Sequence, residues 1–322
     1  MSGPPPPGPG PASPDAPRVS ILVPAFDEAS NMPELFAELG RVIRQGGLSA
    51  EVILVDDGSR DGTLEAARRA ADAAGLSDVR FLRHRRNRGK TDALLTGARA
   101  ARGEYLVLFD ADLQHAPAEI PRFVAELDRG YDMVVGRKVG RYQKRFVSGI
   151  YNWLARRIFG VPVHDLNAMK AFRREVLDEV RLRSDWHRYL VVLAHARGFR
   201  VTEIDVELHP RRHGTSKYSG QGRIVVGTLD LLSVWFQLVF SRRPMLLFGV
   251  TGLVLLGAGA VVGLVAVYLR FVLDTGYRPL LTLVLLLVVV GLLLFAVGFL
   301  AELIASLRGE VDDLRQRLDE RP

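Results

Sequence analysis

Two long segments without a charged residue constrain this chain more than any other feature of its sequence. Residues 244–269 carry no charge over 26 positions, and residues 280–301 carry none over 22. A helix that crosses the hydrocarbon core of a bilayer needs about 20 such residues. Soluble helices are rarely apolar on every face for this length, which argues against the alternative of a buried helical core. The two segments, joined by RFVLDTGYRP, therefore predict a transmembrane hairpin.

The distribution of arginine predicts how this hairpin is oriented. Arginines stand directly before the first apolar segment and after the second, whereas the short connection holds only Arg270 and Arg278. Positively charged residues favour the cytosolic side of a membrane, so both termini are expected in the cytosol. The Pro/Gly-rich residues 1–17 lack the apolar core of a signal peptide and are expected to form a disordered tail. We therefore expect an integral protein of the inner (plasma) membrane with a cytosolic main domain.

Between the tail and the hairpin, apolar runs alternate with helical patterns. The strand-like runs are VSILVPAF, EVILVDD, VRFLRH, YLVLF and YDMVVGRK, and amphipathic stretches of about 10–15 residues separate most of them. This alternation predicts an α/β fold with a mostly parallel, Rossmann-like sheet. Three of the runs end on acidic residues, in PAFDE, VDDGS and FDADLQ. Because open α/β sheets bind ligands beyond the carboxyl ends of their strands, these ends predict a ligand site.

The sequence DAD, which follows the run YLVLF, predicts a metal ion at this site. Desolvating an unpaired carboxylate is costly, so a buried strand gains nothing by ending on Asp110 and Asp112. Two residues apart, these side chains face the same way if the backbone there is extended. Mg²⁺ and Mn²⁺ prefer carboxylate and phosphate oxygens. We predict that the two aspartates hold Mg²⁺ or Mn²⁺ and, through it, the diphosphate of a ligand.

The two aspartates in VDDGS are expected to have different roles, one structural and one in ligand binding. Asp57 and Gly58 form a turn signal, and Ser59 or Asp61 can cap the helix that follows. One of the two adjacent aspartates is therefore expected to be structural. We assign the other, Asp56, to the base or ribose of a nucleotide.

Two basic stretches and a formal net charge of +7 indicate anionic partners. RHRRNRGKT, residues 83–91, lies before a helix and suits a diphosphate. LHPRRHGTSKYSGQGR, residues 208–223, suits either anionic lipid head groups in general or one particular phosphate. Nucleic acid is not expected as a partner, because stacking aromatic residues are not interleaved with the basic ones.

The expected organisation has five parts. They are a tail at 1–17, an α/β domain at 18–223, an interfacial helix at 224–243, the hairpin at 244–304 and a cytosolic tail at 305–322. The amphipathic stretch 146–159 is expected to lie on the membrane surface as well, and core helices are the alternative for both stretches. The sequence leaves open whether the chain forms a homo-oligomer.

Six motifs, in order along the chain, resemble one known family. They are VPAFDEASN, EVILVDDGSRDGT, NRGKTDALLTGARAARGEYLVLFDADLQHAP, VVGRK, VHDLNAMKAFRREVL and RRHGTSKY. Together they resemble the family-2 glycosyltransferases of GT-A fold, and more narrowly the polyprenyl-phosphate glycosyltransferases, the group of dolichol-phosphate mannose synthase. The resemblance implies a metal-dependent, inverting transfer of one sugar from a UDP- or GDP-sugar to a polyprenyl phosphate at the cytosolic membrane face. Two departures, Asp27 for the usual asparagine and LNAMKAF for a Ser-Gly-Phe segment, leave the sugar open.

The resemblance also implies roles for individual residues of the site. The nucleotide pocket would be lined by Pro24, Phe26, Glu28 and Asp56. The metal and diphosphate would be bound by Asp110, Ala111, Asp112 and Gln114, with Lys90 from the first basic stretch. The phosphates of donor or acceptor would be bound by Arg137, Arg211 and Lys217. The residues implied in the chemical step are Asp112, Arg137 and Asp165, the last in contact with the sugar or the acceptor.

A polyprenyl phosphate is an acceptor that needs no general base, because its phosphate oxygen is already ionised at neutral pH. Two alternatives stay open. A transferase acting on a hydroxyl of a glycolipid or polysaccharide would need a base and usually carries a QxxRW-type motif, which this sequence lacks. An inactive scaffold that binds nucleotide or lipid would keep its role after loss of the DAD carboxylates.

Overall fold

The chain divides into two units, Met1–Arg223 and Ile224–Pro322. The computed structural model describes residues 16–139, 157, 160–166, 168–180, 182–183, 186–210, 234, 236, 244–276 and 278–319, without the side chains of 244, 308–309 and 312–319. The helices expected on the membrane surface at 146–159 and 224–243 lie outside the described residues, apart from Arg157, Val234 and Phe236.

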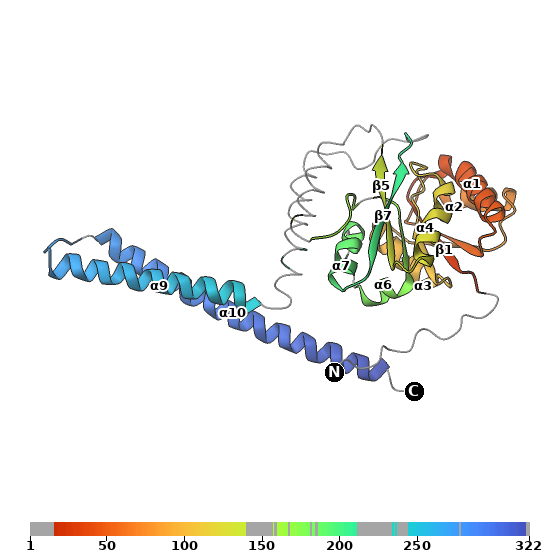
Figure 1. The fold of residues 1–322 in the computed structure, drawn as a ribbon. Coiled ribbons are helices and arrows are strands. Elements are labelled where there is room, and N and C mark those ends of the chain that lie inside the picture. Colours follow the sequence, from red (N-terminus) through yellow and green to blue (C-terminus); the bar gives the residue numbers. More distant parts are fainter. Residues whose placement is uncertain are drawn as a thin grey trace. The chain divides into compact units, whose positions relative to one another are not determined.

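The strands of the first unit form one sheet (Figure 1). This sheet has seven strands in the order β3-β2-β1-β4-β6-β5-β7. The strands are β1 (Val19–Ala25), β2 (Ala50–Asp56), β3 (Val79–Arg83), β4 (Tyr105–Leu108), β5 (Met133–Val139), β6 (Lys170–Arg173) and β7 (Val201–Glu207). All neighbouring pairs are parallel except the two that involve β6, which runs antiparallel between β4 and β5. The prediction of an α/β fold with a mostly parallel sheet is confirmed.

Helices cover both faces of this sheet. They are α1 (Met32–Gln45), α2 (Thr63–Ala73), α3 (Lys90–Ala100), α4 (Ile120–Asp128), α6 (Arg174–Glu179) and α7 (Leu190–Ala196), with 3-10 turns at Ala29–Asn31, Pro117–Glu119 and Trp186–Tyr189. Helices α1, α2 and α4 share one buried apolar cluster with the strands. Helix α3 packs on β1 and β2 through Gly97, where a Cβ atom would lie 3.3 Å from Val55 and 3.4 Å from Leu22. Burial on both faces explains why the strands are apolar throughout rather than alternating.

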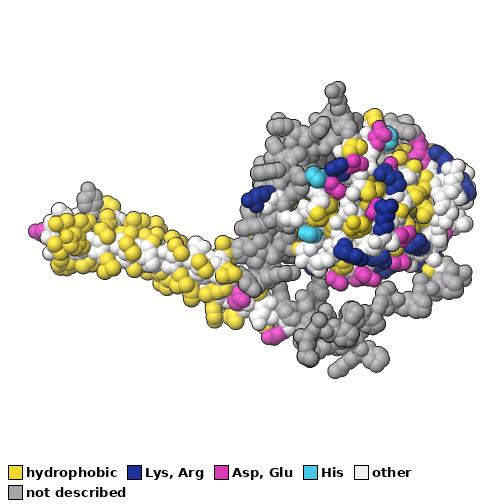
Figure 2. Space-filling view, in the orientation of Figure 1, with side chains coloured by type: hydrophobic (Ala, Val, Ile, Leu, Met, Phe, Trp, Pro, Cys, Tyr) yellow, Lys and Arg dark blue, Asp and Glu magenta, His cyan; other side chains and the backbone are white. Residues whose placement is uncertain are grey.

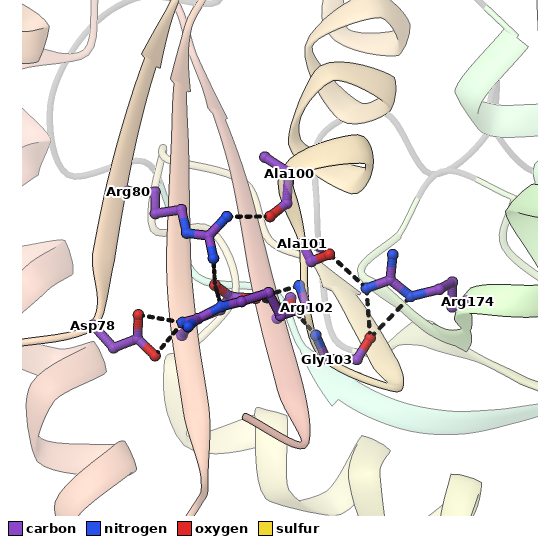
Figure 3. A network of polar contacts seen from close by, with 9 residues as sticks. Asp78, Arg80, Ala100, Ala101, Arg102, Gly103 and Arg174 are labelled. Carbon is purple, nitrogen blue, oxygen red and sulfur yellow. Dashed lines mark hydrogen bonds and ion pairs between the residues drawn. The ribbon is translucent and has the colours of Figure 1, made fainter. Parts of the chain in front are cut away.

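At the amino-terminal end of β2, a buried carboxylate organises a network of arginines (Figure 3). Glu51 is fully buried and accepts hydrogen bonds from Ser20 Oγ at 2.7 Å and from Arg102 N at 2.6 Å. The guanidinium groups of Arg102 and Arg80 lie 3.1 and 3.5 Å from its other oxygen. Burial alone would raise the pKa of Glu51, but the bonds from Ser20 and Arg102 and the charge of Arg102 lower it below its ordinary value.

The glutamine variant of Glu51 tests this network. Because the folded-state pKa is lowered, the carboxylate stabilises the fold fully above the ordinary glutamate pKa, and this contribution is lost as pH falls through the lowered value. We expect Glu51→Gln to lose about 2 kcal/mol at pH 7, which corresponds to a melting temperature lower by about 4–8 °C. The difference from wild type should shrink at pH 3–4 in thermal unfolding of the detergent-solubilised chain. A difference that stays constant from pH 7 to pH 3 would contradict this account.

The second unit consists of two apolar helices, α9 (Pro244–Phe271) and α10 (Arg278–Asp319). Both are long and apolar enough to cross a membrane, with mean hydropathy of 2.4 and 3.3 over their most apolar windows. Only 11% and 6% of these windows are buried, and their surface in Figure 2 is almost continuously hydrophobic. The two predicted apolar helices are confirmed. Helix α10 continues without a break past residue 304, where a separate tail was expected.

Glycines allow α9 and α10 to approach closely. A Cβ atom on Gly252 would lie 2.7 Å from the carbonyl oxygen of Gly291, and one on Gly291 would lie 2.9 Å from that of Gly252. Two turns further along α10, a Cβ atom on Gly298 would lie 2.8 Å from the backbone nitrogen of Gly249. In lipid the association of helices depends on such close backbone packing, since there is no hydrophobic driving force between them. The glycines therefore determine how closely α9 and α10 pack against each other.

Alanine at Gly252 should loosen the hairpin, whereas alanine at Gly257 should not. Overpacking typically costs about 1–3 kcal/mol, and the atom opposite Gly252 is backbone that cannot move aside. Gly257 lies in the same helix with no atom within 4 Å of an added Cβ, so it is the matched control. We expect Gly252→Ala alone to lower the temperature at which the protein aggregates in mild detergent. Equal aggregation temperatures of the two variants would show that the close packing at Gly252 does not contribute to stability.

Candidate active site

Three neighbouring parallel strands bring their acidic ends to one edge of the sheet. Strand β1 lies between β2 and β4, in register from Val19 opposite both Ala50 and Tyr105. The residues that follow β1, the last residue of β2 and the residues that follow β4 therefore meet at this carboxyl edge. Strands β5 and β7 end at the same edge, and the antiparallel β6 begins there with Lys170.

The loop after β1 is fastened to the loop after β2 by hydrogen bonds. Asp27 N donates to Ser59 Oγ, Glu28 N donates to Thr63 Oγ1, and Ala29 N donates to a carboxylate oxygen of Asp61, each at 2.9 Å. In return Arg60 N donates to Asp27 Oδ1 at 2.8 Å. Asp27 has a φ of 51°, in the left-handed region that aspartate and asparagine tolerate better than most residues. These hydrogen bonds fix the position of Phe26 and Glu28. Pro24 is half-buried and lies within β1 itself.

Asp56 combines full burial with an incompletely bonded carboxylate. Its Oδ1 accepts a hydrogen bond from Ser59 N at 2.8 Å. Its Oδ2 is buried without a hydrogen-bond partner in the described part of the chain, although Arg83 Nε lies 3.2 Å away. Next to it lies an open pocket of ≈ 470 Å³ lined by Gly58, Ser59, Arg60, Arg83, His84 and Arg85. A buried oxygen that lacks a donor is suited to a ligand hydroxyl or amide.

Asp57 holds the basic loop in place. Its Oδ1 accepts from Arg88 N at 2.9 Å and lies 2.7 Å from His84 Nδ1, and its Oδ2 accepts from Gly89 N at 2.7 Å. Gly89 has a φ of 92°, which only glycine adopts readily, immediately before α3 begins at Lys90. Asp57 therefore has the structural contacts that the sequence assigned to one of the two adjacent aspartates.

The DAD sequence lies in a turn, not in an extended strand. Strand β4 ends at Leu108, before both aspartates. Alternation along a strand therefore does not turn Asp110 and Asp112 the same way. Leu113 has a φ of 54°, which is unusual for a residue with a branched side chain and marks a tight turn. Asp112 is 8% exposed, and its Oδ1 accepts a hydrogen bond from Gln114 N at 3.2 Å. The backbone carbonyl oxygen of Gln114 accepts a hydrogen bond from His209 N at 2.9 Å, which joins this turn to the segment after β7.

Asp110 is ion-paired with Lys90, the first residue of α3. Their side chains are 36% and 26% exposed, so the pair lies at the surface of the site and a ligand can reach it. Burial alone would raise the pKa of Asp110, but the charge of Lys90 and its hydrogen bond hold that pKa well below the ordinary value. The carboxylate is therefore ionised at neutral pH, as metal binding requires.

Two lysines outside the predicted set of site residues lie near the DAD turn. Lys138 Nζ lies 3.5 Å from an oxygen of Asp165. Lys170 is 1% exposed, its Nζ donates to the carbonyl of Ala168 at 2.9 Å, and burial lowers its pKa to about 7. The neighbouring His115 has a buried Nδ1 without a hydrogen-bond partner among the described residues, and burial lowers its pKa to about 4. The two lysines and His115 lie in the motifs VVGRK, VHDLNAMKAFRREVL and FDADLQHAP, but nothing in the sequence indicated that they lie close together.

Arg137 on β5 is bound to carboxylates of β7. Its Nε and one terminal nitrogen donate to Asp205 at 2.5 and 2.8 Å, and its other terminal nitrogen lies 3.6 Å from Glu203. The guanidinium is 42% exposed, so it keeps a face toward solvent while its orientation is fixed. The other two predicted phosphate ligands, Arg211 and Lys217, lie outside the described residues.

The carboxylates after β4 fit a magnesium or manganese ion that is shared with a substrate. The described residues contain no group of three or more His, Cys, Asp or Glu side chains arranged to hold a metal by themselves. Mg²⁺ commonly binds through one or two carboxylates together with substrate phosphates and water. Asp110 and Asp112 supply two such carboxylates beside the cation of Lys90, which is the donor set expected for a metal–diphosphate complex.

Sequence comparison places the chain among sugar transferases. A family model described as "Glycosyl transferase family 2" matches residues 20–181. The dodecaprenyl-phosphate galacturonate synthase of Rhizobium johnstonii is 36% identical over 301 residues, which cover 89% of this chain and 88% of that protein. The undecaprenyl-phosphate 4-deoxy-4-formamido-L-arabinose transferase of Aeromonas hydrophila is 30% identical over 306 residues, which cover 92% and 91% of the two chains.

Solved structures share the fold of the first unit at low sequence identity. The glucosyl-3-phosphoglycerate synthase from Mycobacterium tuberculosis, in complex with Mg²⁺ and uridine diphosphate, has a TM-score of 0.54. It is 19% identical, and the match covers 67% of this chain and 80% of the other. The same synthase in complex with Mn²⁺, uridine diphosphate and glucosyl-3-phosphoglycerate has a TM-score of 0.53 at 18% identity.

Proposed function

The chain belongs to glycosyltransferase family 2, and on that premise we propose that it transfers one sugar, with inversion, from a UDP- or GDP-sugar to a polyprenyl phosphate. The observation that carries this proposal is the joint presence of two features in one chain. One is the DAD turn at the carboxyl edge of the sheet, and the other is a pair of apolar helices suited to a lipid-linked acceptor. Relatives that match almost the full length are named for dodecaprenyl and undecaprenyl phosphate.

The donor would bind across the ends of β2, β1 and β4. The base and ribose would contact Pro24, Phe26, Glu28 and Asp56, whose unsatisfied Oδ2 supports this role. The diphosphate would lie against Asp110, Ala111, Asp112, Gln114 and Lys90. When bound, Mg²⁺ or Mn²⁺ would neutralise the charge that develops on the departing diphosphate.

The chemical step needs positioning and charge compensation but no general base. An oxygen of the acceptor phosphate attacks the anomeric carbon from the face opposite the diphosphate, and the bond from that carbon to the diphosphate oxygen breaks. The acceptor oxygen is already ionised, so no proton has to be removed. Arg137, held by Asp205, together with Arg211 and Lys217, would bind the acceptor or donor phosphates. Asp165, paired with Lys138, would contact the sugar or the acceptor.

The proposed location is the cytosolic face of the inner membrane, with both termini and the domain 18–223 in the cytosol. Support comes from the two apolar helices and from the excess of arginine outside their short connection. This arrangement would bring a water-soluble nucleotide sugar and a membrane-bound phosphate to one site.

A transfer assay tests the proposal. Purified full-length protein in detergent is incubated with undecaprenyl phosphate, Mg²⁺ or Mn²⁺, and a panel of radiolabelled UDP- and GDP-sugars. We expect label from one donor to enter the organic phase and EDTA to abolish this transfer. Label that appears only with a hydroxyl-bearing glycolipid would overturn the acceptor assignment. Nucleotide binding without transfer from any donor would favour an inactive scaffold.

A further inference from the structure

We propose that Lys90 occupies the metal position on Asp110 in the unliganded protein and moves to the donor diphosphate when the metal binds. The inference rests on the proposed function, because it takes Asp110 and Asp112 as the metal ligands. It adds a coupling between metal and nucleotide that the proposed function does not contain. Its starting point is the direct ion pair between Lys90 Nζ and Asp110 Oδ1.

The ammonium group and a divalent cation compete for the same carboxylate. A metal ion that joined Asp110 while Lys90 stayed in place would lie within a few ångströms of another cation, and such like-charge pairs are unfavourable. Lys170 lies near both Lys90 and Asp110, and it adds to the repulsion when it is protonated. Metal binding in the absence of nucleotide is therefore weakened as long as Lys90 stays on Asp110, and it is favoured when Lys90 leaves.

The side chain of Lys90 can move while its backbone stays fixed. The preceding residue, Gly89, donates its N–H to Asp57 Oδ2 at 2.7 Å, and Arg88 N donates to the same carboxylate at 2.9 Å. The lysine itself has a flexible four-carbon stem. It sits at the first position of α3, an 11-residue helix, where the helix dipole disfavours a cation and favours an anion. Without Asp110 as partner, the ammonium is best compensated by a phosphate.

The diphosphate of the donor provides this second partner at the moment when the first is lost. It arrives with the metal, is bound by the same metal, and carries negative charge toward the N-terminus of α3. Lys90 thus makes metal and nucleotide bind cooperatively, since each ligand removes a cost of binding the other. By linkage, the factor by which nucleotide tightens metal binding equals the factor by which metal tightens nucleotide binding.

The test measures Mn²⁺ binding by electron paramagnetic resonance, without nucleotide and with saturating UDP or GDP. The variants are Lys90→Met, which removes the charge but keeps the stem, and Lys90→Arg, which keeps the charge. Arg99→Met is the matched control, because it removes one exposed cation from the last turn of the same helix, outside the basic stretch. We expect Lys90→Met to bind Mn²⁺ alone about 3–10 times more tightly than wild type.

The same variant should lose most of the cooperativity. We expect the tightening of Mn²⁺ binding by UDP or GDP to fall by about tenfold in Lys90→Met and to be kept in Lys90→Arg and Arg99→Met. Unchanged or weaker Mn²⁺ binding by Lys90→Met would overturn the inference while leaving the metal site intact. A wild-type protein whose Mn²⁺ binding is absent, or is unaffected by Asp112→Asn, would instead overturn the metal assignment and the inference with it.

Discussion

Replacing Asp112 by asparagine is expected to lower sugar transfer by about 10³-fold or more while leaving the protein folded. Asp112 is 8% exposed in the turn after β4, where its Oδ1 already accepts the N–H of Gln114. Asparagine keeps the size and this hydrogen bond but removes the charge that a divalent cation requires. Loss of electrostatic stabilisation of a developing charge costs about 10²–10³-fold for a single donor, and loss of a metal costs more.

The assay for this prediction is transfer of labelled sugar to undecaprenyl phosphate at saturating Mg²⁺. Asp72→Asn is the matched control, because it removes one negative charge from the exposed end of α2. The control should retain wild-type turnover, and both variants should melt within a few degrees of wild type. An Asp112→Asn protein with wild-type turnover would remove this carboxylate from the metal site. If excess Mn²⁺ restored part of the activity, the loss would be assigned to metal affinity.

Replacing Asp57 by alanine should have the largest effect on stability of any substitution at the carboxyl edge. The side chain is 4% exposed and bonds Arg88 N, Gly89 N and the ring of His84. Its removal takes away the acceptor shared by two part-buried backbone donors and the ring of His84, and it releases the basic loop from the end of β2. Breaking such a buried charged network costs about 3–5 kcal/mol, which corresponds to a melting temperature lower by about 10 °C.

The melting temperature in detergent, read by intrinsic fluorescence, measures this effect. Asp78→Ala is the control, since it breaks an exposed ion pair with Arg102, in which Asp78 is 43% and Arg102 42% exposed. Exposed pairs of this kind contribute little, so the control should melt close to wild type. Nucleotide binding by Asp57→Ala should weaken together with its stability, because Lys90 follows directly on the loop that Asp57 holds. A stable Asp57→Ala protein would mean that the loop is held by contacts other than these.

The sequence alone was sufficient for the features that depend on local patterns. Helices α9 and α10 follow from two segments without charge, because the length of an apolar helix is a property of consecutive residues. The parallel arrangement of β1 to β4 follows from alternating apolar runs and helices. That polar ends of β1, β2 and β4 share one edge follows from this arrangement.

Features that join distant parts of the chain came only from the tertiary structure. Strand β6, four residues long, was not recognised as a strand, and its antiparallel place between β4 and β5 brings Lys170 to the site. The turn that contains Asp110 also came only from the folded chain, because the apolar pattern gives no signal for where β4 ends.

The division of roles at the carboxyl edge also required the folded chain. Asp56 and Asp57 are chemically identical neighbours. The turn signal Asp57-Gly58 favoured Asp56 for the ligand, but the contacts that distinguish them come from the loop that returns to Asp57 some 30 residues later. The pairing of Lys90 with Asp110 depends on α3 packing against β1, the neighbour of β4. Sequence patterns are read over a few residues, whereas a charge pair forms between whichever groups the strand order brings together. The sequence by itself thus determined most of the elements and the edge where a ligand is expected, and the strand order decided which side chains face each other there.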